Sequence, residues 1–274
     1  MSESPSTILA VHAHPDDETI FTGGSLAVYA ARGVRTVVVT LTDGGLGYDP
    51  EGIPGAEPGH DELNTVLNRA LELSSALREL GVSDHYALGY GDSGMAGWPQ
   101  NDEPMTLCGE PFEEEVERLV EIIDQVKPDV VITYDANGFY GHPDHIRCHE
   151  VTVAALELCE RQDIRFFEIA IPRSAIEGMI SMAGCHEAEL PAWVLDTPSY
   201  AAEDDRVTTL IDCSEFGAAK YRALCAHATQ IDNSFFWELG EDLYAKIFST
   251  EWYIARRGVE SGQCASDLLE GLSA

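Results

Sequence analysis

Residues 7–18 read TILAVHAHPDDE, an apolar run that ends in a cluster of histidine and carboxylate side chains. The run from Thr7 to Ala13 predicts a buried strand. The residues from Glu18 to Arg32 predict a helix, and Gly33 is placed to end it. A buried strand that leads directly into a helix is the repeating unit of a parallel sheet covered by helices.

The same alternation continues away from this stretch. Further strands are predicted at 35–41, 84–88, 129–134 and 164–171, and further helices at 63–80, 112–126 and 143–161. Two segments rich in Gly and Pro, Thr42–Gly59 and Tyr90–Pro111, are predicted to be long loops, and loops of this length are usually functional. Past Pro172 the pattern is weaker, with a helix expected at 214–229 and a strand at 251–255.

This order of elements predicts an α/β fold. We expect a Rossmann-like three-layer sandwich with a mostly parallel sheet. Residues 1–274 are expected to form a single domain, with a Rossmann-like core over about 6–172 and a C-terminal extension over about 173–274.

Composition restricts the partners of the chain. Lys and Arg number 16 against 48 Asp and Glu, so the formal net charge is −32. Such a surface repels nucleic acids and anionic membranes. No apolar run is long enough to span a bilayer, and the N-terminus lacks the pattern of a signal peptide. The seven Cys include no CxxC pair, which favours reduced thiols, so we expect a cytoplasmic protein.

Two predicted strands end in His-Pro-Asp motifs. The first is followed by HAHPDDE (12–18) and the fourth by DANGFYGHPDH (135–145). Each motif offers ligand-type side chains at i, i+3 spacing: His14 with Asp17, and His142 with His145. Either motif alone could be an ordinary helix cap, because Pro and Asp are common in a first helical turn. Two matching motifs at neighbouring strand ends favour a shared metal ion, and imidazole and carboxylate groups suit zinc.

The pair AHPDDE and GHPDH resembles the PIG-L/LmbE-like zinc-dependent de-N-acetylases. That family includes N-acetylglucosaminyl-phosphatidylinositol deacetylases and the glucosaminide deacetylases of the mycothiol and bacillithiol pathways. The resemblance covers most of the chain. It continues in Arg69-x-x-Glu72-Leu73, in Asp92-Ser93-Gly94-Met95, in Ile171-Pro172-Arg173-Ser174 and in His227-Ala228-Thr229-Gln230.

The resemblance implies a zinc-dependent hydrolase that removes the N-acetyl group of an N-acetylglucosaminide. Zinc would be held by His14, Asp17 and His145, and iron or cobalt could substitute because an N/O site selects weakly among these metals. Asp16 is implied to be the general base. His142 is implied to stabilise the oxyanion or to protonate the leaving amine.

Three further roles follow from the same resemblance. Tyr140 is implied to polarise the amide carbonyl, and Arg69 and Asp92 are implied to hold sugar hydroxyls. Arg69 could instead form a structural salt bridge, and His227 could be a packed helix histidine. His12 is expected to support the site or the core and not to bind metal.

Other functions remain open at this stage. One is the cleavage of a larger thiol-conjugate amide by the same family. Another is non-catalytic binding of a sugar or metal on the same scaffold, although pure binding requires neither Asp16 nor His142. A nucleotide-binding Rossmann protein is disfavoured, because Gly89-x-Gly91-x-x-Gly94 is not followed by a helical pattern. The expected partner is a small-molecule glycoside, and a homo-oligomer is compatible with the sequence.

The net charge generates a first prediction. Because like charges repel one another, the melting temperature should rise with salt, which shortens the screening length to about 3 Å at 1 M. We expect a rise of at least about 3 °C between low and 1 M potassium chloride, corresponding to about 1 kcal/mol. Thermal melts in a series of salt concentrations check this, and a flat or falling series contradicts it.

Overall fold

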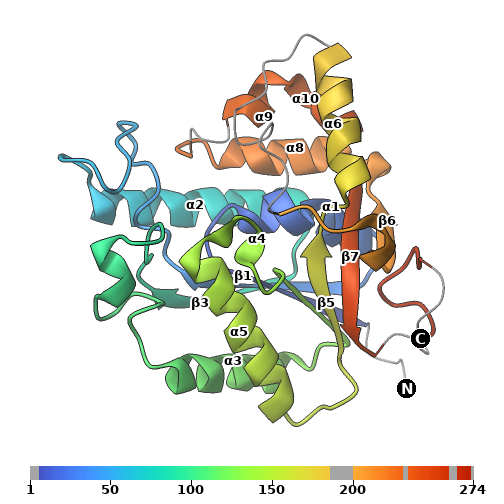
Figure 1. Cartoon of the computed structure of the whole chain (residues 1–274), viewed down its shortest axis with the longest axis horizontal. Helices are drawn as coiled ribbons and strands as arrows, with labels where there is room; N and C mark the ends of the chain where they lie inside the picture. The colour runs from blue at the N-terminus through green and yellow to red at the C-terminus, as the bar shows by residue number, and fades with distance from the viewer. Residues whose placement is uncertain (1–5, 186–199, 231–233, 259–263, 273–274) are drawn as a thin grey trace.

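The computed structural model describes residues 6–185, 200–230, 234–258 and 264–272 (Figure 1). Seven strands form one mixed sheet in the order β3-β2-β1-β4-β5-β7-β6. The five parallel strands are β1 (Thr7–His12), β2 (Arg35–Thr42), β3 (Asp84–Tyr90), β4 (Val130–Thr133) and β5 (Arg165–Ala170). The strands β7 (Thr250–Arg257) and β6 (Thr209–Asp212) extend the sheet in antiparallel fashion.

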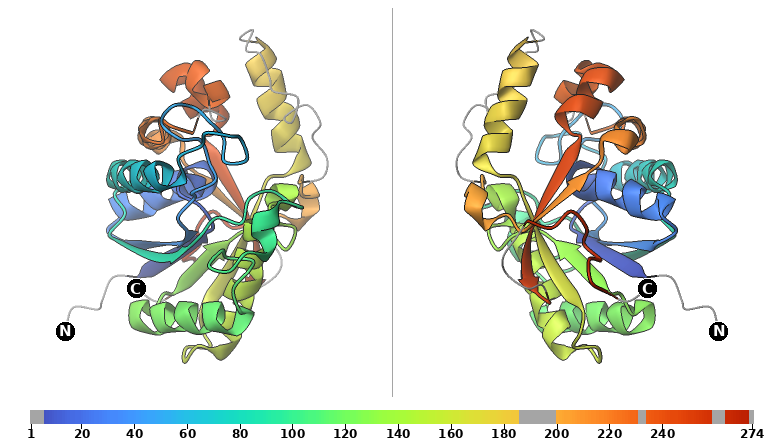
Figure 2. Two further views of the ribbon diagram at one scale, coloured as in Figure 1. Left: turned by 90° about the vertical axis from the view of Figure 1, so that its left-hand side faces the viewer. Right: turned by 90° about the vertical axis from the view of Figure 1, so that its right-hand side faces the viewer.

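Helices cover both faces of the sheet, as Figures 1 and 2 show. One face carries α1 (Asp17–Ala31), α2 (Glu62–Leu80) and α8 (Gly217–Ala226), and the other carries α3 (Phe112–Val126) and α5 (Pro143–Leu158). The predicted α/β sandwich with a mostly parallel sheet is therefore confirmed. Among the described residues, no helix has the length and apolar character needed to cross a membrane.

The central strands are mostly apolar because helices cover them on both sides. Every residue of β1 and β4 is buried. Local signals define the helix ends: the Asp61 side chain accepts the Asn64 N–H at the start of α2, and Gly81 ends it with φ 72°. At the start of α5, Pro143 occupies the first turn and the His142 ring accepts the Asp144 N–H.

The C-terminal part departs most from the sequence-based prediction. The pattern past Pro172 predicted one helix and one strand. The structure adds β6, α6 (Arg173–Cys185), α9 (Ser234–Glu238) and α10 (Gly240–Ile247), and the helix predicted at 214–229 is the shorter α8 after the single turn η3 (Ser214–Phe216). The short turn η1 (Pro99–Asp102) interrupts the predicted loop Tyr90–Pro111, and the turns α4 (Gly138–Gly141) and η2 (Asp204–Arg206) lie where no element was predicted. These elements are short, and tertiary packing overrides weak local periodicity in such segments.

The strand order creates a crevice at the carboxyl end of β1. From β1 the chain proceeds outward to β2 and β3, and then returns through α3 to β4 on the other side of β1. In open α/β sheets, ligands bind where the strand order reverses in this way. Both His-Pro-Asp motifs follow the two strands that border this point.

Candidate active site

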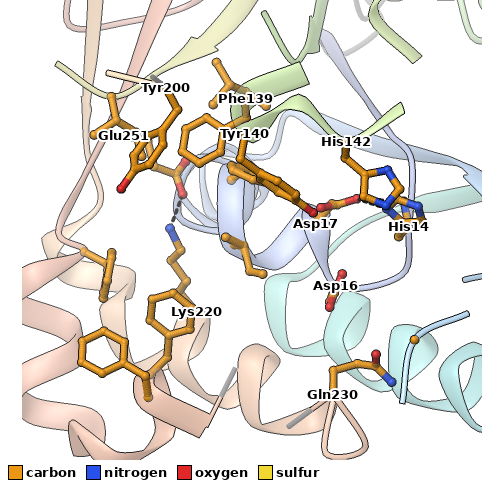
Figure 3. Close-up of a pocket in the computed structure, with 18 of the residues that line it drawn as sticks. His14, Asp16, Asp17, Phe139, Tyr140, His142, Tyr200, Lys220, Gln230 and Glu251 are labelled. Carbon is orange, nitrogen blue, oxygen red and sulfur yellow. Dashed lines mark hydrogen bonds and ion pairs between the residues drawn. The ribbon is translucent and has the colours of Figure 1, made fainter. Parts of the chain in front are cut away.

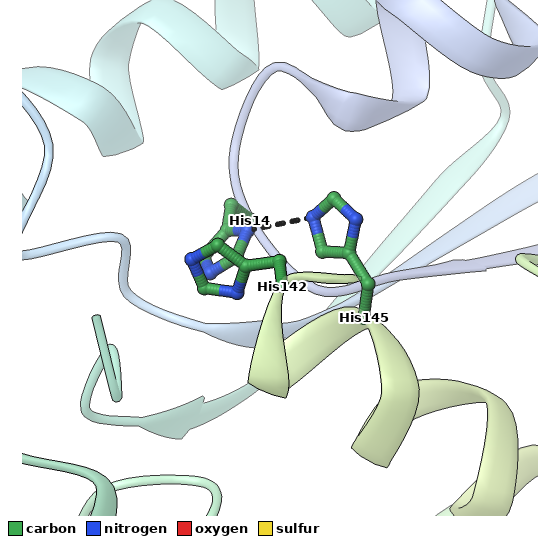
Figure 4. Close-up of side chains that lie close together, drawn as sticks. All are labelled: His14, His142 and His145. Carbon is green, nitrogen blue, oxygen red and sulfur yellow. Dashed lines mark hydrogen bonds between the residues drawn. The ribbon is translucent and has the colours of Figure 1, made fainter. Parts of the chain in front are cut away.

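Three ligand-type side chains converge at the β1/β4 crevice. His14 Nδ1 lies 3.3 Å from Asp17 Oδ2, and His145 Nε2 lies 3.4 Å from Asp17 Oδ1. The facing nitrogens of His14 and His145 are 3.3 Å apart (Figure 4). All three residues are buried.

The spacing fits a tetrahedral metal ion. Two ligands that are each about 2.05 Å from a tetrahedral zinc lie about 3.3 Å from one another. The separation of the two imidazole nitrogens matches this value, and Asp17 approaches His14 with Oδ2 and His145 with Oδ1 at similar distances. A ligand atom of His142 also lies within 4.8 Å of those of His14 and His145, so the cluster has a fourth imidazole at its edge. Two imidazoles and one carboxylate would hold a divalent metal and leave a position free for another oxygen.

Tyr134, the residue after β4, holds this cluster together. Its hydroxyl donates to Asp17 Oδ2 at 2.7 Å and accepts the Ala13 N–H at 2.9 Å. Its ring stacks on His145, with centroids 4.1 Å apart and planes 12° apart. One fully buried tyrosine therefore orients two of the predicted ligands. The sequence placed Tyr134 at a strand end, but nothing in the pattern assigned it this role.

The outward nitrogen of His14 faces two carboxylates. His14 Nε2 lies 3.1 Å from Asp144 Oδ2 and 3.6 Å from Asp92 Oδ1. Asp144 is fully buried and also accepts the Ser93 N–H at 2.9 Å. A carboxylate on the far nitrogen fixes the orientation and tautomer of a metal-binding imidazole. The signal for Asp144 was its place in the second His-Pro-Asp motif, and we did not predict its role.

The backbone of Asp16 separates the two adjacent aspartates. Asp16 has φ 119°, a conformation that non-glycine residues rarely adopt. The Asp16 carboxylate lies 3.3 Å from Arg69 Nη2 and lines the pocket, whereas Asp17 faces the imidazoles. Burial raises the pKa of Asp16 to about 6, against the opposing effect of the Arg69 guanidinium.

Glu18 supports this strained residue from inside the protein. Glu18 Oε2 accepts the Asp16 N–H at 2.9 Å, and Oε1 lies 2.9 Å from His227 Nε2. Both Glu18 and His227 are fully buried. Although burial alone would lower it, the Glu18 carboxylate raises the pKa of His227. His227 is thus a packed histidine that also forms an ion pair behind Asp16, and sequence reasoning missed its partner Glu18.

The surroundings of the His142 ring favour its neutral form. Its Nδ1 accepts the Asp144 N–H at 3.2 Å, which leaves Nε2 as the proton-bearing nitrogen. Burial, together with His14 and His145, lowers the pKa of His142 to about 3. Among the two implied roles, this arrangement favours hydrogen-bond donation to a developing oxyanion.

Tyr140 lies at the mouth of the site. It is 50% exposed, and its ring centroid is 5.1 Å from that of His145 and 6.0 Å from that of His142. The preceding Phe139 has φ 62° and packs against Phe21, with centroids 4.9 Å apart. The tyrosine is therefore close to the cluster but carried on a short, strained turn.

Arg69 and Asp92 both line the pocket, yet both have protein partners. Arg69 donates to the carbonyls of Gly44 (2.8 Å) and Pro15, in addition to its contact with Asp16. Asp92 accepts the Gly94 N–H at 2.8 Å beside His14. The salt-bridge alternative for Arg69 is thus present in the structure. His12 is fully buried and lies 2.9 Å from the Thr22 hydroxyl, in agreement with a core role.

Two stretches that share the family resemblance, 69–73 and 227–230, contact each other behind this site. The Thr229 N–H and hydroxyl both donate to the Glu72 carboxylate at 2.8 Å. The Gln230 side chain pairs with the backbone of Tyr48, accepting its N–H at 3.3 Å and donating to its carbonyl at 3.1 Å. Gln230 points toward Asp16 in the pocket (Figure 3). The C-terminal part therefore braces the loop that follows β2.

Comparisons with known proteins agree with the geometry. The family described as GlcNAc-PI de-N-acetylase (PIG-L) matches residues 9–156, and the chain belongs to this family. Two relatives named 1D-myo-inositol 2-acetamido-2-deoxy-alpha-D-glucopyranoside deacetylase are similar over nearly the whole chain. The one from Acidothermus cellulolyticus is 41% identical, covering 92% of this chain and 89% of its own. The one from Salinispora arenicola is 38% identical, and the match covers 97% of this chain and 91% of the relative.

Solved structures show the same fold at low identity. N,N'-diacetylchitobiose deacetylase from Pyrococcus horikoshii aligns with a TM-score of 0.57 and 20% identity, covering 93% of this chain and 85% of that one. A zinc-inhibited teicoplanin deacetylase aligns with a TM-score of 0.58 and 21% identity, and the match covers 93% of this chain and 100% of that one. A 4-carboxy-2-hydroxymuconate hydratase from Pseudomonas putida aligns with a TM-score of 0.61 and 17% identity, and the match covers 95% of this chain and 100% of that one. The expected family and deacetylase class are confirmed by the family match and the close relatives, whereas the fold alone also accommodates a hydratase.

The adjacent aspartates lead to a second prediction. Asp17→Asn should lose metal and activity together, because an amide oxygen is a much weaker zinc ligand than a carboxylate. Asp16→Asn should keep its metal but lose turnover by about 100-fold or more, because an amide cannot accept a proton. Elemental analysis and acetate release on the two purified variants check this. Equal metal contents in the two variants would contradict the assignment.

The contacts of Arg69 lead to a third prediction. In Arg69→Met, no guanidinium lowers the pKa of Asp16. The acidic limb of the pH profile of kcat/KM should therefore move to higher pH. The two freed carbonyls should also lower stability by about 1–3 kcal/mol. Arg69→Lys, which keeps the charge, is the matched control and should show the smaller pH shift. If the acidic limb of the pH profile is the same in Arg69→Met as in the wild type, the titration of Asp16 does not cause that limb.

Proposed function

We propose that this chain is a zinc-dependent N-acetylglucosaminide deacetylase. The observation that carries the proposal is the convergence of His14 Nδ1, Asp17 and His145 Nε2 at tetrahedral spacing in a pocket that also contains Asp16 and His142. Binding alone would require neither of the last two groups. The substrate that we propose first is the GlcNAc-inositol glycoside of the close relatives' name.

Zinc held by His14, Asp17 and His145 would polarise the amide carbonyl and lower the pKa of a water molecule. We assign Asp16 to accept the proton of the attacking water. Its carboxylate is turned away from Asp17 by the left-handed backbone, and a base with a pKa of about 6 is mostly ionised at neutral pH. Arg69 and Glu18 would keep this carboxylate in place.

We assign the neutral His142 ring to stabilise the oxygen of the tetrahedral intermediate through Nε2–H. Tyr140, exposed and beside His142, would add a second donor to the same oxygen. Asp92 and Arg69, which both line the pocket, would contact the sugar. These two also have structural partners, so their substitution should affect both binding and stability.

We propose that residues 1–274 act as a single deacetylase domain with a small-molecule glycoside as its partner. The acidic composition disfavours nucleic acid and anionic lipid surfaces as partners. A cytoplasmic location stays a prediction from the sequence.

A substrate panel tests the function. Protein loaded with zinc, iron or cobalt should release acetate from the GlcNAc-inositol glycoside, and metal-stripped protein should not until metal is restored. N,N'-diacetylchitobiose and a thiol-conjugate amide serve as the alternative substrates. Faster cleavage of the thiol conjugate would favour the amidase alternative. Metal binding without any hydrolysis would favour a non-catalytic protein.

A further inference from the structure

Residues 43–61 follow β2 and form one wall of the cavity at its catalytic end. We call them the pocket loop, which Figure 1 shows in light blue beside the start of α2. The loop residues that line the cavity are Leu46, Gly47, Tyr48 and Pro54. At Gly47 the backbone passes so close to Arg69 and Gln230 that an added Cβ would clash with both side chains. The position of this backbone therefore sets the room for a sugar beside Asp16.

Two side chains with little exposure organise the pocket loop from within. The Asp49 carboxylate accepts three backbone N–H groups of the loop, at 2.9, 2.8 and 3.2 Å. His60 faces two of its carbonyl groups: Nδ1 lies 2.9 Å from the oxygen of Ile53, and Nε2 lies 2.8 Å from that of Gly45. The side chain of His60 is only 6% exposed, so water has little access to either contact.

The two contacts of His60 require its doubly protonated form. A carbonyl oxygen can only accept a hydrogen bond, so each ring nitrogen must carry a proton to donate. A neutral imidazole has one N–H and would place the lone pair of its other nitrogen against a carbonyl oxygen. The imidazolium donates from both nitrogens and satisfies both carbonyls.

The acidic groups around the ring favour the same form. Asp49 Oδ2 lies 4.0 Å from His60 Nδ1. On the Nε2 side, the Asp43 carboxylate accepts the Gly45 N–H at 2.9 Å, and the Glu62 side chain lies beside Gly45. These three carboxylates come from different segments around the ring, and each attracts an imidazolium.

His60 is connected to the catalytic carboxylate through two backbone carbonyls. It holds the carbonyl of Gly45, and the preceding carbonyl of Gly44 accepts from Arg69 Nη1 at 2.8 Å. Arg69 in turn lies 3.3 Å from the Asp16 carboxylate, which balances the charge of this cation. His60 itself does not line the cavity. It therefore acts on the site by placing the wall and not by touching the substrate.

We propose that His60, as an imidazolium, is a positioning residue that holds the pocket loop in place for substrate binding. Loss of its second proton removes the donor from one of the two carbonyls and releases that part of the loop. The loop is therefore held at low pH and released as the pH rises. Because His60 touches neither the metal-type cluster nor Asp16, the release should raise KM more than it lowers kcat. The inference rests on the proposed function only for this kinetic consequence.

A first experiment measures the loop without turnover. NMR of zinc-loaded protein with ¹⁵N-labelled histidine, with the His60 signals assigned by through-bond experiments, follows the ring from about pH 5 up to the pH at which its second proton is lost. At the lower limit both ring nitrogens should carry protons. The amides of Gly47 and Asp49 bond to the carbonyls of Gly44 and Ile53 inside the loop. As the second proton is lost, their protection factors should fall by up to about tenfold, because one carbonyl loses its hydrogen bond.

Kinetics with matched variants form the second experiment. His60→Gln keeps one donor group and no charge. His85→Gln is the control, because His85 is exposed on β3 and does not line the cavity. At low pH, His60→Gln should raise KM for the GlcNAc-inositol glycoside by up to about tenfold, with a smaller change in kcat. It should also lose the wild-type rise of KM with pH, whereas His85→Gln should match the wild type in both respects. Melting curves establish that the variants are folded.

The outcomes decide the role of His60 separately from the proposed function. A His60 ring that carries a single N–H at the lower pH limit overturns the proposal. So does deprotonation that leaves the amide protection unchanged, or a folded His60→Gln variant with the wild-type KM and pH dependence. If His60→Gln does not fold, the NMR and exchange measurements on the wild type still decide. If no glycoside is hydrolysed, the proposed function fails, whereas those two measurements test the role of His60 on their own.

Discussion

The site depends on the parallel pairing of β1 with β4. Ile8 pairs with Val130 and Ala10 with Ile132, so the two strands end at the same level. The segments that follow them, each with a His-Pro-Asp motif, must therefore meet over the reversal of strand order. Tyr134 makes the junction rigid through its bonds to Ala13 and Asp17 and its stacking on His145. A change that shifted this register by one residue would move every apolar side chain to the other face of the sheet and separate the predicted ligands.

A second constraint acts on the backbone between the two aspartates. Adjacent side chains can perform different tasks only if the chain turns sharply between them, and the left-handed conformation of Asp16 makes that turn. Such a conformation costs of order 1–3 kcal/mol and persists where the surroundings hold it. Glu18, His227 and Arg69 supply that support from α1, from the end of α8 and from α2. The C-terminal part of the chain is thus connected to catalysis although it supplies none of the predicted ligands.

The fold by itself does not decide the chemistry. Deacetylases and a hydratase share this architecture at similar TM-scores. What separates them must lie in the side chains placed at the crevice and in the segments that enclose it. In this chain, residues of α6, α9 and α10 line the same pocket as the side chains at the crevice.

The sequence by itself determined the parallel strand–helix alternation, the two motif-bearing strand ends and the residue types of a metal site, because these are properties of contiguous segments. His14 with Asp17, and His142 with His145, are close because only two residues separate the members of each pair. Only the tertiary structure decided that Glu18 pairs with His227, that Asp144 faces His14 and that Arg69 holds the Pro15 and Gly44 carbonyls. Those contacts join residues far apart in the chain and leave no periodic signal. Strand β6 and the antiparallel direction of β7 belong to the same category, since they form there only because the rest of the sheet is already in place to receive them.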